Sequence, residues 1–280
     1  MFNWSEKRGS LPSKRNGHSS AEKEIIIRED APIGLRQFIP QLLFDLRMSP
    51  NEVRAIVCRV LRVAPDTQHN WGEPNVSNEI YELLENCEWF FVYDIIERFY
   101  HVLTPINRPE FAEEINDYFK TNGIGWKLEN GRIEFRGDEL FENDLEKVVK
   151  DLGDVKLHTA QNEIREAIND LSRRPEPDIT GAIQHGVACL ECVSRDVVGN
   201  NKITLGELIK RNREIVPPTI DTSVEKIWGF SSEQGRHLRE QREPSYEEAE
   251  LMLGLSASIS TYLAKKKKLL QPPPDVWNDF

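Results

Sequence analysis

A long amphipathic helix near the end of the chain constrains the fold more than any other feature of the sequence. Ser245 and Glu248 have the spacing of a capping box, in which each side chain satisfies a backbone N–H group at a helix start. Apolar residues follow at helical spacing and define the face expected to be buried: Leu251, Met252, Leu255, Ile259, Tyr262 and Leu263. Such a helix needs partners against which it can bury that face. The sequence therefore predicts a helical bundle.

The pattern is helical throughout the second half of the chain. The helices predicted there cover residues 159–173, 179–198, 204–212, 220–240 and 245–267. We place a domain boundary at residues 151–158, where a short polar stretch interrupts the apolar periodicity. The longer helices beyond it are expected to pack antiparallel, as a bundle over residues 153–268.

The first half also has helical periodicity, but one β-hairpin interrupts it. The helices predicted there cover residues 32–47, 50–63, 77–86, 89–101, 109–122 and 138–152, with Ser77 as a helix cap. In residues 124–136, apolar and polar residues alternate about Asn130-Gly131, the pattern of a two-residue hairpin turn. We therefore predict a mainly α fold, with a helical domain over residues 25–152 that contains this hairpin, followed by the bundle.

Composition excludes several classes of function. The net charge of −11 argues against a sequence-independent coat for nucleic acid, although one basic cleft remains compatible with it. No apolar run is long enough to span a membrane, and the N-terminus lacks the apolar core of a signal peptide. We expect a cytoplasmic protein with a flexible basic arm (residues 1–24) and a mobile Pro-rich tail (residues 269–280). The run Lys265–Lys268 is expected to be solvated.

The densest group of residues suited to acid–base or phosphate chemistry precedes the last helix. Arg236 and His237 lie there among charged neighbours: Glu233, Arg239, Glu240, Arg242 and Glu243. An imidazole can move the proton of a hydroxyl group, and a guanidinium can stabilise a phosphorane-like transition state. Adjacent helical residues point about 100° apart, so one chain is not expected to place both groups on the same phosphate. The sequence leaves open whether they form an active site or a structural cluster with the glutamates.

Other candidate residues have simpler interpretations. Cys189 and Cys192 have the spacing of a metal or redox pair, but they lie in an apolar helical stripe and no second cysteine pair exists. We expect core cysteines, with no metal and no cofactor. His185 is interpreted as a partly buried helix residue, and Arg173 and Arg174 as a solvated helix end.

Both halves resemble known families. The first half resembles the N-terminal domain of AbiJ-type abortive-infection proteins in several stretches: IIIRED (Ile25–Asp30), the helix from Leu35 to Leu46, EWFFVYDIIE (Glu88–Glu97) and GIGWKLENGRIEF (Gly123–Phe135). The second half resembles a HEPN helical domain in three stretches: Ala167–Val197, Thr204–Arg211 and Trp228–Leu263. The resemblance implies a bacterial anti-phage or toxin-like effector, because many HEPN domains are dimeric ribonucleases that need no metal.

The HEPN resemblance also implies roles for individual residues. His237 would be the acid or base, Arg236 the phosphate-stabilising group, and Arg239, Arg242 and Ser232 would bind RNA or nucleotide. Active members carry an Arg a few residues before the His. This chain departs from that pattern, because Ser231 and Ser232 occupy the positions where an Arg and a polar partner are expected.

Two functions therefore stay open. In the first, the HEPN-like bundle cleaves RNA. In the second, it is a catalytically degenerate module that dimerises and binds nucleotide, RNA or a protein partner. For either function we expect a homodimer that buries residues 228–243, no contact with a membrane, and a partner or antitoxin protein that the sequence does not identify.

Overall fold

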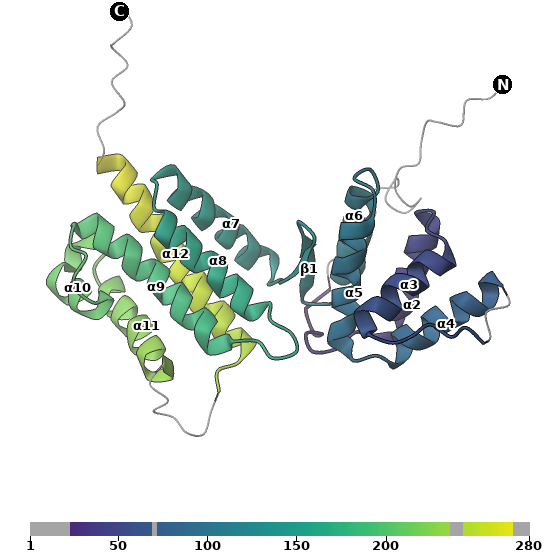
Figure 1. Ribbon diagram of the computed structural model, residues 1–280. Helices are drawn as coiled ribbons and strands as arrows, with labels where there is room; N and C mark the ends of the chain where they lie inside the picture. Colours follow the sequence, from purple (N-terminus) through teal and green to yellow (C-terminus); the bar gives the residue numbers. More distant parts are fainter. Residues whose placement is uncertain (1–22, 69–71, 236–242, 271–280) are drawn as a thin grey trace, which may run out of the picture. The chain divides into compact units, whose positions relative to one another are not determined.

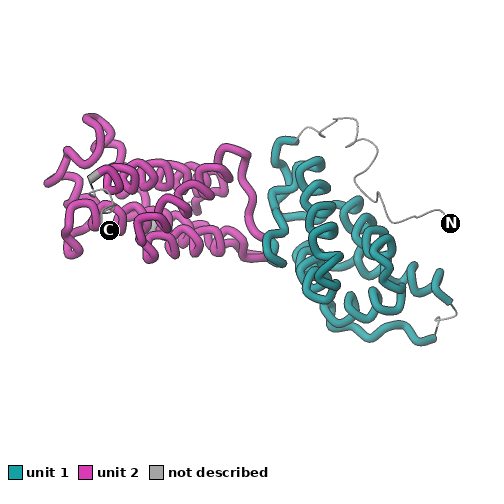
Figure 2. Tube along the Cα trace, turned by 90° about the horizontal axis from the view of Figure 1, so that it is seen from above, with its two compact units in different colours: residues 1–133 teal, residues 134–280 magenta. Residues whose placement is uncertain are grey.

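The computed structural model describes residues 23–68, 72–235 and 243–270 (Figure 1). The predicted arm and tail lie outside these ranges, apart from residues 23–24 and 269–270. The described residues form eleven α-helices and one two-stranded hairpin, so the predicted mainly α fold is confirmed. Contacts divide the chain into two compact units, residues 1–133 and residues 134–280 (Figure 2). None of the described helices combines the length and apolar character that crossing a membrane requires.

The N-terminal unit is built around a strongly apolar helix. Its elements are α2 (Ile33–Asp45), α3 (Pro50–Leu61), α4 (Glu73–Asn86), α5 (Trp89–Val102), α6 (Arg108–Thr121) and β1 (Trp126–Glu129). Strand β1 pairs with β2 (Arg132–Phe135), within which the division between the two units falls. On α5, Tyr93 and Phe99 are fully buried. The Trp126 ring packs 5.7 Å from the Tyr93 ring. Aromatic side chains of α5 therefore form part of the core of this unit.

One helix start differs from the prediction. Ser77 does not cap α4, which begins four residues earlier at Glu73 with Gly72 as its N-cap. Pro74 explains the difference, since its fixed φ suits the first turn of a helix and its missing N–H is not needed there. The extra turn buries Val76, which lies outside the predicted helix 77–86.

The C-terminal unit is a helical bundle arranged around α9. Its elements are α7 (Glu139–Asp154), α8 (His158–Leu171), α9 (Ile179–Val198), α10 (Leu205–Arg211), the 3₁₀ turn η1 (Arg213–Ile215), α11 (Ile220–Gly235) and α12 (Tyr246–Leu270). Helices α8, α10, α11 and α12 all pack on α9, and α7 packs on α12 and α8. The contacts thus divide the chain before α7, whereas the sequence pattern had suggested a boundary after it.

The lysines at the end of α12 are part of this packing. Lys265 and Lys268 form ion pairs with Asp151 and Asp154 of α7, at 3.8 and 3.3 Å. Lys267 pairs with Asp196 of α9 at 2.6 Å. The expectation of a purely solvated run was therefore wrong, because acidic residues distant in sequence lie opposite these lysines.

The buried face of α12 also differs from the predicted one. Met252 and Leu263 are buried, but Leu251, Leu255 and Tyr262 are 60%, 41% and 42% exposed. The buried face consists largely of small residues: Ala249, Ser256, Ala257, Ser260 and Ala264. Short side chains let α12 approach its neighbours closely, so the larger apolar residues on the adjacent face remain outside. We call the exposed residues Leu251, Leu255 and Tyr262 the α12 apolar row.

The hairpin turn provides a test of the fold of the N-terminal unit. Asn130 and Gly131 have φ values of +50° and +83°, as a type I′ turn requires. A Cβ atom at Gly131 would lie 2.5 Å from the Tyr100 ring. We expect Gly131→Ala to lower the free energy of unfolding by about 1–3 kcal/mol, measured by denaturant unfolding.

Asn130→Gly is the matched control for this change. It keeps a residue that tolerates positive φ in the same turn, so its free energy of unfolding should stay within about 0.5 kcal/mol of the wild type. Equal stability of the two variants would show that neither the turn geometry nor the Tyr100 contact matters.

Candidate functional site

The predicted site lies between the last two helices, and the structure describes only its borders. Arg236, His237, Arg239 and Arg242 lie outside the described residues, so their side chains are not placed. Ser232 is described and is half-buried on α11. The preceding residue, Ser231, is buried, so an arginine at this position would have to enter the bundle. The substitution of serine for the expected arginine therefore fits the packing of α11.

The two helices that border residues 236–242, α11 and α12, are both held by contacts within the C-terminal unit. On the α11 side, the Trp228 ring lies against Gly206 of α10, where an added Cβ atom would be only 2.8 Å from it. On the α12 side, the Ser245 N–H donates to the Glu248 carboxylate at 3.0 Å, and the Glu248 N–H donates to the Ser245 hydroxyl at 3.4 Å. The predicted capping box is thus confirmed, and it fixes the start of α12.

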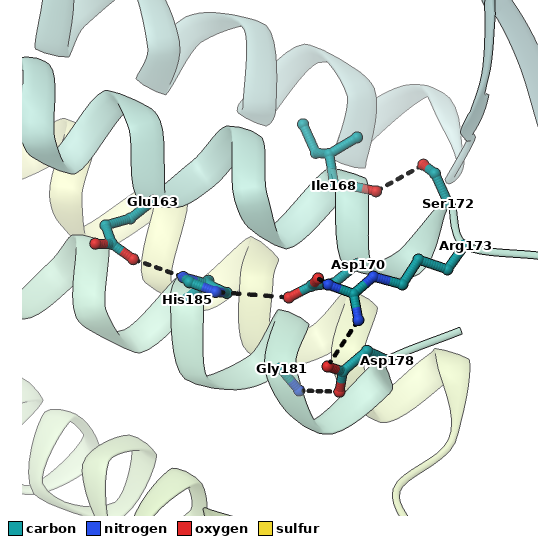
Figure 3. Close-up of polar contacts among 8 residues, drawn as sticks. All are labelled: Glu163, Ile168, Asp170, Ser172, Arg173, Asp178, Gly181 and His185. Atoms are coloured by element: carbon teal, nitrogen blue, oxygen red, sulfur yellow. Dashed lines mark hydrogen bonds and ion pairs between the residues drawn. The ribbon is translucent and has the colours of Figure 1, made fainter. Parts of the chain in front are cut away.

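A second polar cluster lies between α8 and α9 (Figure 3). His185 Nδ1 is 2.7 Å from the Glu163 carboxylate, and His185 Nε2 is 3.6 Å from the Asp170 carboxylate. Arg173 also binds Asp170, at 2.6 Å, and reaches Asp178 at 3.2 Å. His185 is therefore a bridging residue, and Arg173 joins two carboxylates although its side chain remains exposed.

Asp170 is the centre of this cluster. Its side chain is only 3% exposed. Gly181 on α9 makes room for it, because a Cβ atom there would lie 2.7 Å from the Asp170 carboxylate. Burial raises the pKa of Asp170 above its ordinary value, and the positive charge of Arg173 offsets part of this effect. The cluster ties the end of α8 to the start of α9.

The geometry of this cluster favours a structural role over catalysis. Both ring nitrogens of His185 face carboxylates. The neighbouring Ser172 hydroxyl donates to the Ile168 carbonyl at 2.6 Å (Figure 3). It also accepts from the Phe135 N–H at 2.8 Å. The hydroxyl is thus already engaged twice and is poorly suited to act as a nucleophile.

The cysteine pair has no catalytic geometry either. Cys189 is fully buried, and burial raises the pKa of its thiol to about 12, so it stays protonated and unreactive at neutral pH. Cys192 is half-buried instead of belonging fully to the core. Within the described residues, no group of three or more His, Cys, Asp or Glu side chains is placed to hold a metal ion.

The comparison with protein families identifies the class of protein. The N-terminal helices and hairpin are those of an AbiJ-type N-terminal domain: the family described as AbiJ N-terminal domain 4 matches residues 12–151, half of the chain. The chain therefore belongs to this family, which places it in the context of abortive infection and defence against phages. No curated protein and no solved structure matches the chain.

The raised pKa of Asp170 leads to a prediction about stability. A carboxyl group whose pKa is higher in the folded state stabilises the fold below its unfolded pKa of about 3.8, and this contribution is lost as pH rises through the folded value. Asn does not titrate. The free energy of unfolding of the wild type relative to Asp170→Asn should therefore fall as the pH rises above the unfolded pKa of about 3.8, measured by denaturant unfolding.

Asp178→Asn removes an exposed carboxylate of the same cluster and serves as the control. A wild type that instead gains stability over Asp170→Asn with rising pH would contradict the prediction. It would mean that the Arg173 and His185 contacts outweigh the burial of Asp170.

Proposed function

We propose that this protein is an effector of abortive infection whose C-terminal bundle cleaves RNA without a metal ion. The observation that carries the proposal is the position of the segment 236–242, which joins two helices of the bundle, α11 and α12. This segment holds Arg236, His237, Arg239 and Arg242. Among the described side chains of the bundle, His185 is occupied by carboxylates and Cys189 is buried. We place the proposed chemistry on this segment because it combines one histidine with three arginines.

The basic residues of the segment have defined roles in the proposed reaction. The ribose 2′-OH attacks the adjacent phosphorus, and the bond from phosphorus to the 5′-oxygen of the next nucleotide breaks. His237 takes the proton of the 2′-OH or gives one to the leaving oxygen. Arg236 stabilises the charge of the transition state. Arg239, Arg242 and Ser232 hold the flanking phosphates.

A second copy of the chain completes the site in this proposal. Adjacent residues such as Arg236 and His237 diverge on a helix, so two chains would pool them across a two-fold axis. The α12 apolar row supports a pairing surface close to the segment, since Leu251 lies about 8 Å along the helix from its start at Tyr246. Exposed large apolar side chains on one helix face are typical of a contact surface.

Cleavage of RNA in the presence of EDTA tests the catalytic role. Purified protein should cut RNA, and His237→Ala should reduce the rate by about 10²–10⁴, the usual cost of losing a general acid or base. Arg236→Lys should also be damaging, because an ammonium group does not reproduce the planar two-point contact. His158→Ala, which removes an exposed histidine of α8, is the matched control and should leave the rate unchanged.

A folded, dimeric His237→Ala protein that cuts RNA at the wild-type rate would reject the assignment. One observation favours a second function, a binding module without catalysis: Ser231 replaces the expected arginine and is buried. In that case Arg236→Lys, which keeps the charge, should bind RNA almost as the wild type does, and no variant should show metal-independent cleavage.

The dimer has its own test. Leu251→Glu combined with Leu255→Glu places two charges on the α12 apolar row and should convert the dimer to a monomer, measured by light scattering at micromolar concentration. Leu140→Glu on α7 introduces a charge at another highly exposed apolar residue and should leave the dimer intact. A wild-type protein that is monomeric under these conditions, or a dimer insensitive to the double change, would contradict this part of the proposal.

A further inference from the structure

The N-terminal unit carries a groove that the proposed function does not use. Its volume is about 920 Å³, and it is lined by residues of α4, of the end of α3 with the loop that follows, and of the start of α5. Lining residues on α4 run from Asn75 to Asn86, which corresponds to about 16 Å of helix. A groove of this length accommodates about three turns of a second helix.

The floor of the groove is apolar. Apolar lining comes from Leu61 at the end of α3, Val63 in the loop after it, Leu83 on α4 and Phe91 on α5. Val63 is exposed, and the other three are half-buried although they belong to a unit with a well-filled core. These side chains provide apolar surface that a partner can remove from water, which is the main favourable contribution to such an association.

The rim of the groove is acidic. Glu82 and Glu88 line it, both are exposed, and neither forms an ion pair with any other described residue. Glu79 is also acidic, but it is bound by Arg54 at 3.0 Å and by the Asp66 N–H at 2.6 Å. Glu82 and Glu88 therefore remain available to a basic partner.

Among the described residues that line the groove, Arg54 is the one basic side chain, and it does not neutralise the exposed glutamates. Arg54 is only 8% exposed. Besides binding Glu79, its guanidinium donates to the Asn51 side chain at 3.2 Å and to the Asp66 carbonyl at 3.3 Å. Arg54 thus fixes the loop after α3 against α4, which keeps the groove open and pre-formed. The charge that a ligand can reach is negative, because it belongs to Glu82 and Glu88.

We propose that this groove docks a helical segment of a partner protein that carries a row of apolar side chains flanked by Lys or Arg. The apolar side chains would lie on Leu61, Leu83 and Phe91, and the basic ones would face Glu82 and Glu88. This arrangement is a helix-in-groove contact, in which burial supplies the affinity and charge supplies the orientation. The negative rim disfavours nucleic acid at this surface, since RNA would meet unpaired carboxylates.

A labelled synthetic peptide tests the proposal with the full chain. The probe is a helix with a row of Leu side chains flanked by Lys, and its binding is followed by fluorescence anisotropy. A second peptide of the same composition but with the Leu row scrambled controls for charge alone. We expect binding of the first peptide, at least about tenfold weaker binding of the scrambled one, and a loss of affinity with rising salt.

Protein variants locate the binding surface. Glu82→Lys with Glu88→Lys should weaken binding of the first peptide at least about tenfold, because two attractive contacts become repulsive. Glu24→Lys with Glu110→Lys changes the net charge of the same unit equally, at exposed residues that do not line the groove, and should change the affinity less than about twofold. Val63→Ser tests the floor at an exposed position and should also weaken binding.

Three results would overturn the proposal. They are equal affinity for the two peptides, an equal loss in the two charge-reversed variants, and absence of binding by the full chain. Far-ultraviolet circular dichroism shows that each variant is folded. Because RNA cleavage and dimerisation are measured separately, loss of peptide binding leaves the proposed function of the C-terminal unit untouched.

Discussion

The C-terminal unit depends on the close approach of α9 and α12. Gly186 on α9 has no side chain, and a Cβ atom there would lie 3.1 Å from Leu253 of α12. One turn further along α9, the Cys189 thiol is 3.8 Å from the Ser260 hydroxyl. Helices approach this closely only when the side chains between them are small. The remaining helices pack around this pair, so the exposed α12 apolar row follows from the same constraint.

Because of this constraint, the residue ranges of the helices could be predicted from the sequence more accurately than the faces that the helices bury. The predicted range 179–198 agrees with α9, and the Asn130-Gly131 turn was predicted from local pattern alone. Helix ends and turns depend on nearby residues, which the sequence displays directly. The buried face of α12 depends on a neighbour about 70 residues away in the chain, and ranking residues by hydrophobicity selected the face with the larger side chains.

We did not predict the polar cluster at His185 from the sequence, because it also depends on contacts between two different helices. The sequence shows an isolated histidine on α9, while its partners Glu163 and Asp170 belong to α8. A signal was nevertheless present, since Glu163 and Asp170 are seven residues apart and therefore lie on one face of their helix, two turns from each other. Two carboxylates on a face that also buries Ile164, Ala167 and Leu171 need partners on the opposing helix.

Ion pairs within the bundle affect which basic residues are available to bind RNA. The lysines Lys265, Lys267 and Lys268 are engaged by aspartates of α7 and α9, so a phosphate would have to compete with carboxylates already in place. Arg173 is held between Asp170 and Asp178 in the same way. These four cations are thus already paired within the bundle. Under the proposed function, the contacts with RNA phosphates therefore fall chiefly to the arginines of the segment 236–242, next to the α12 apolar row that would bring two copies together.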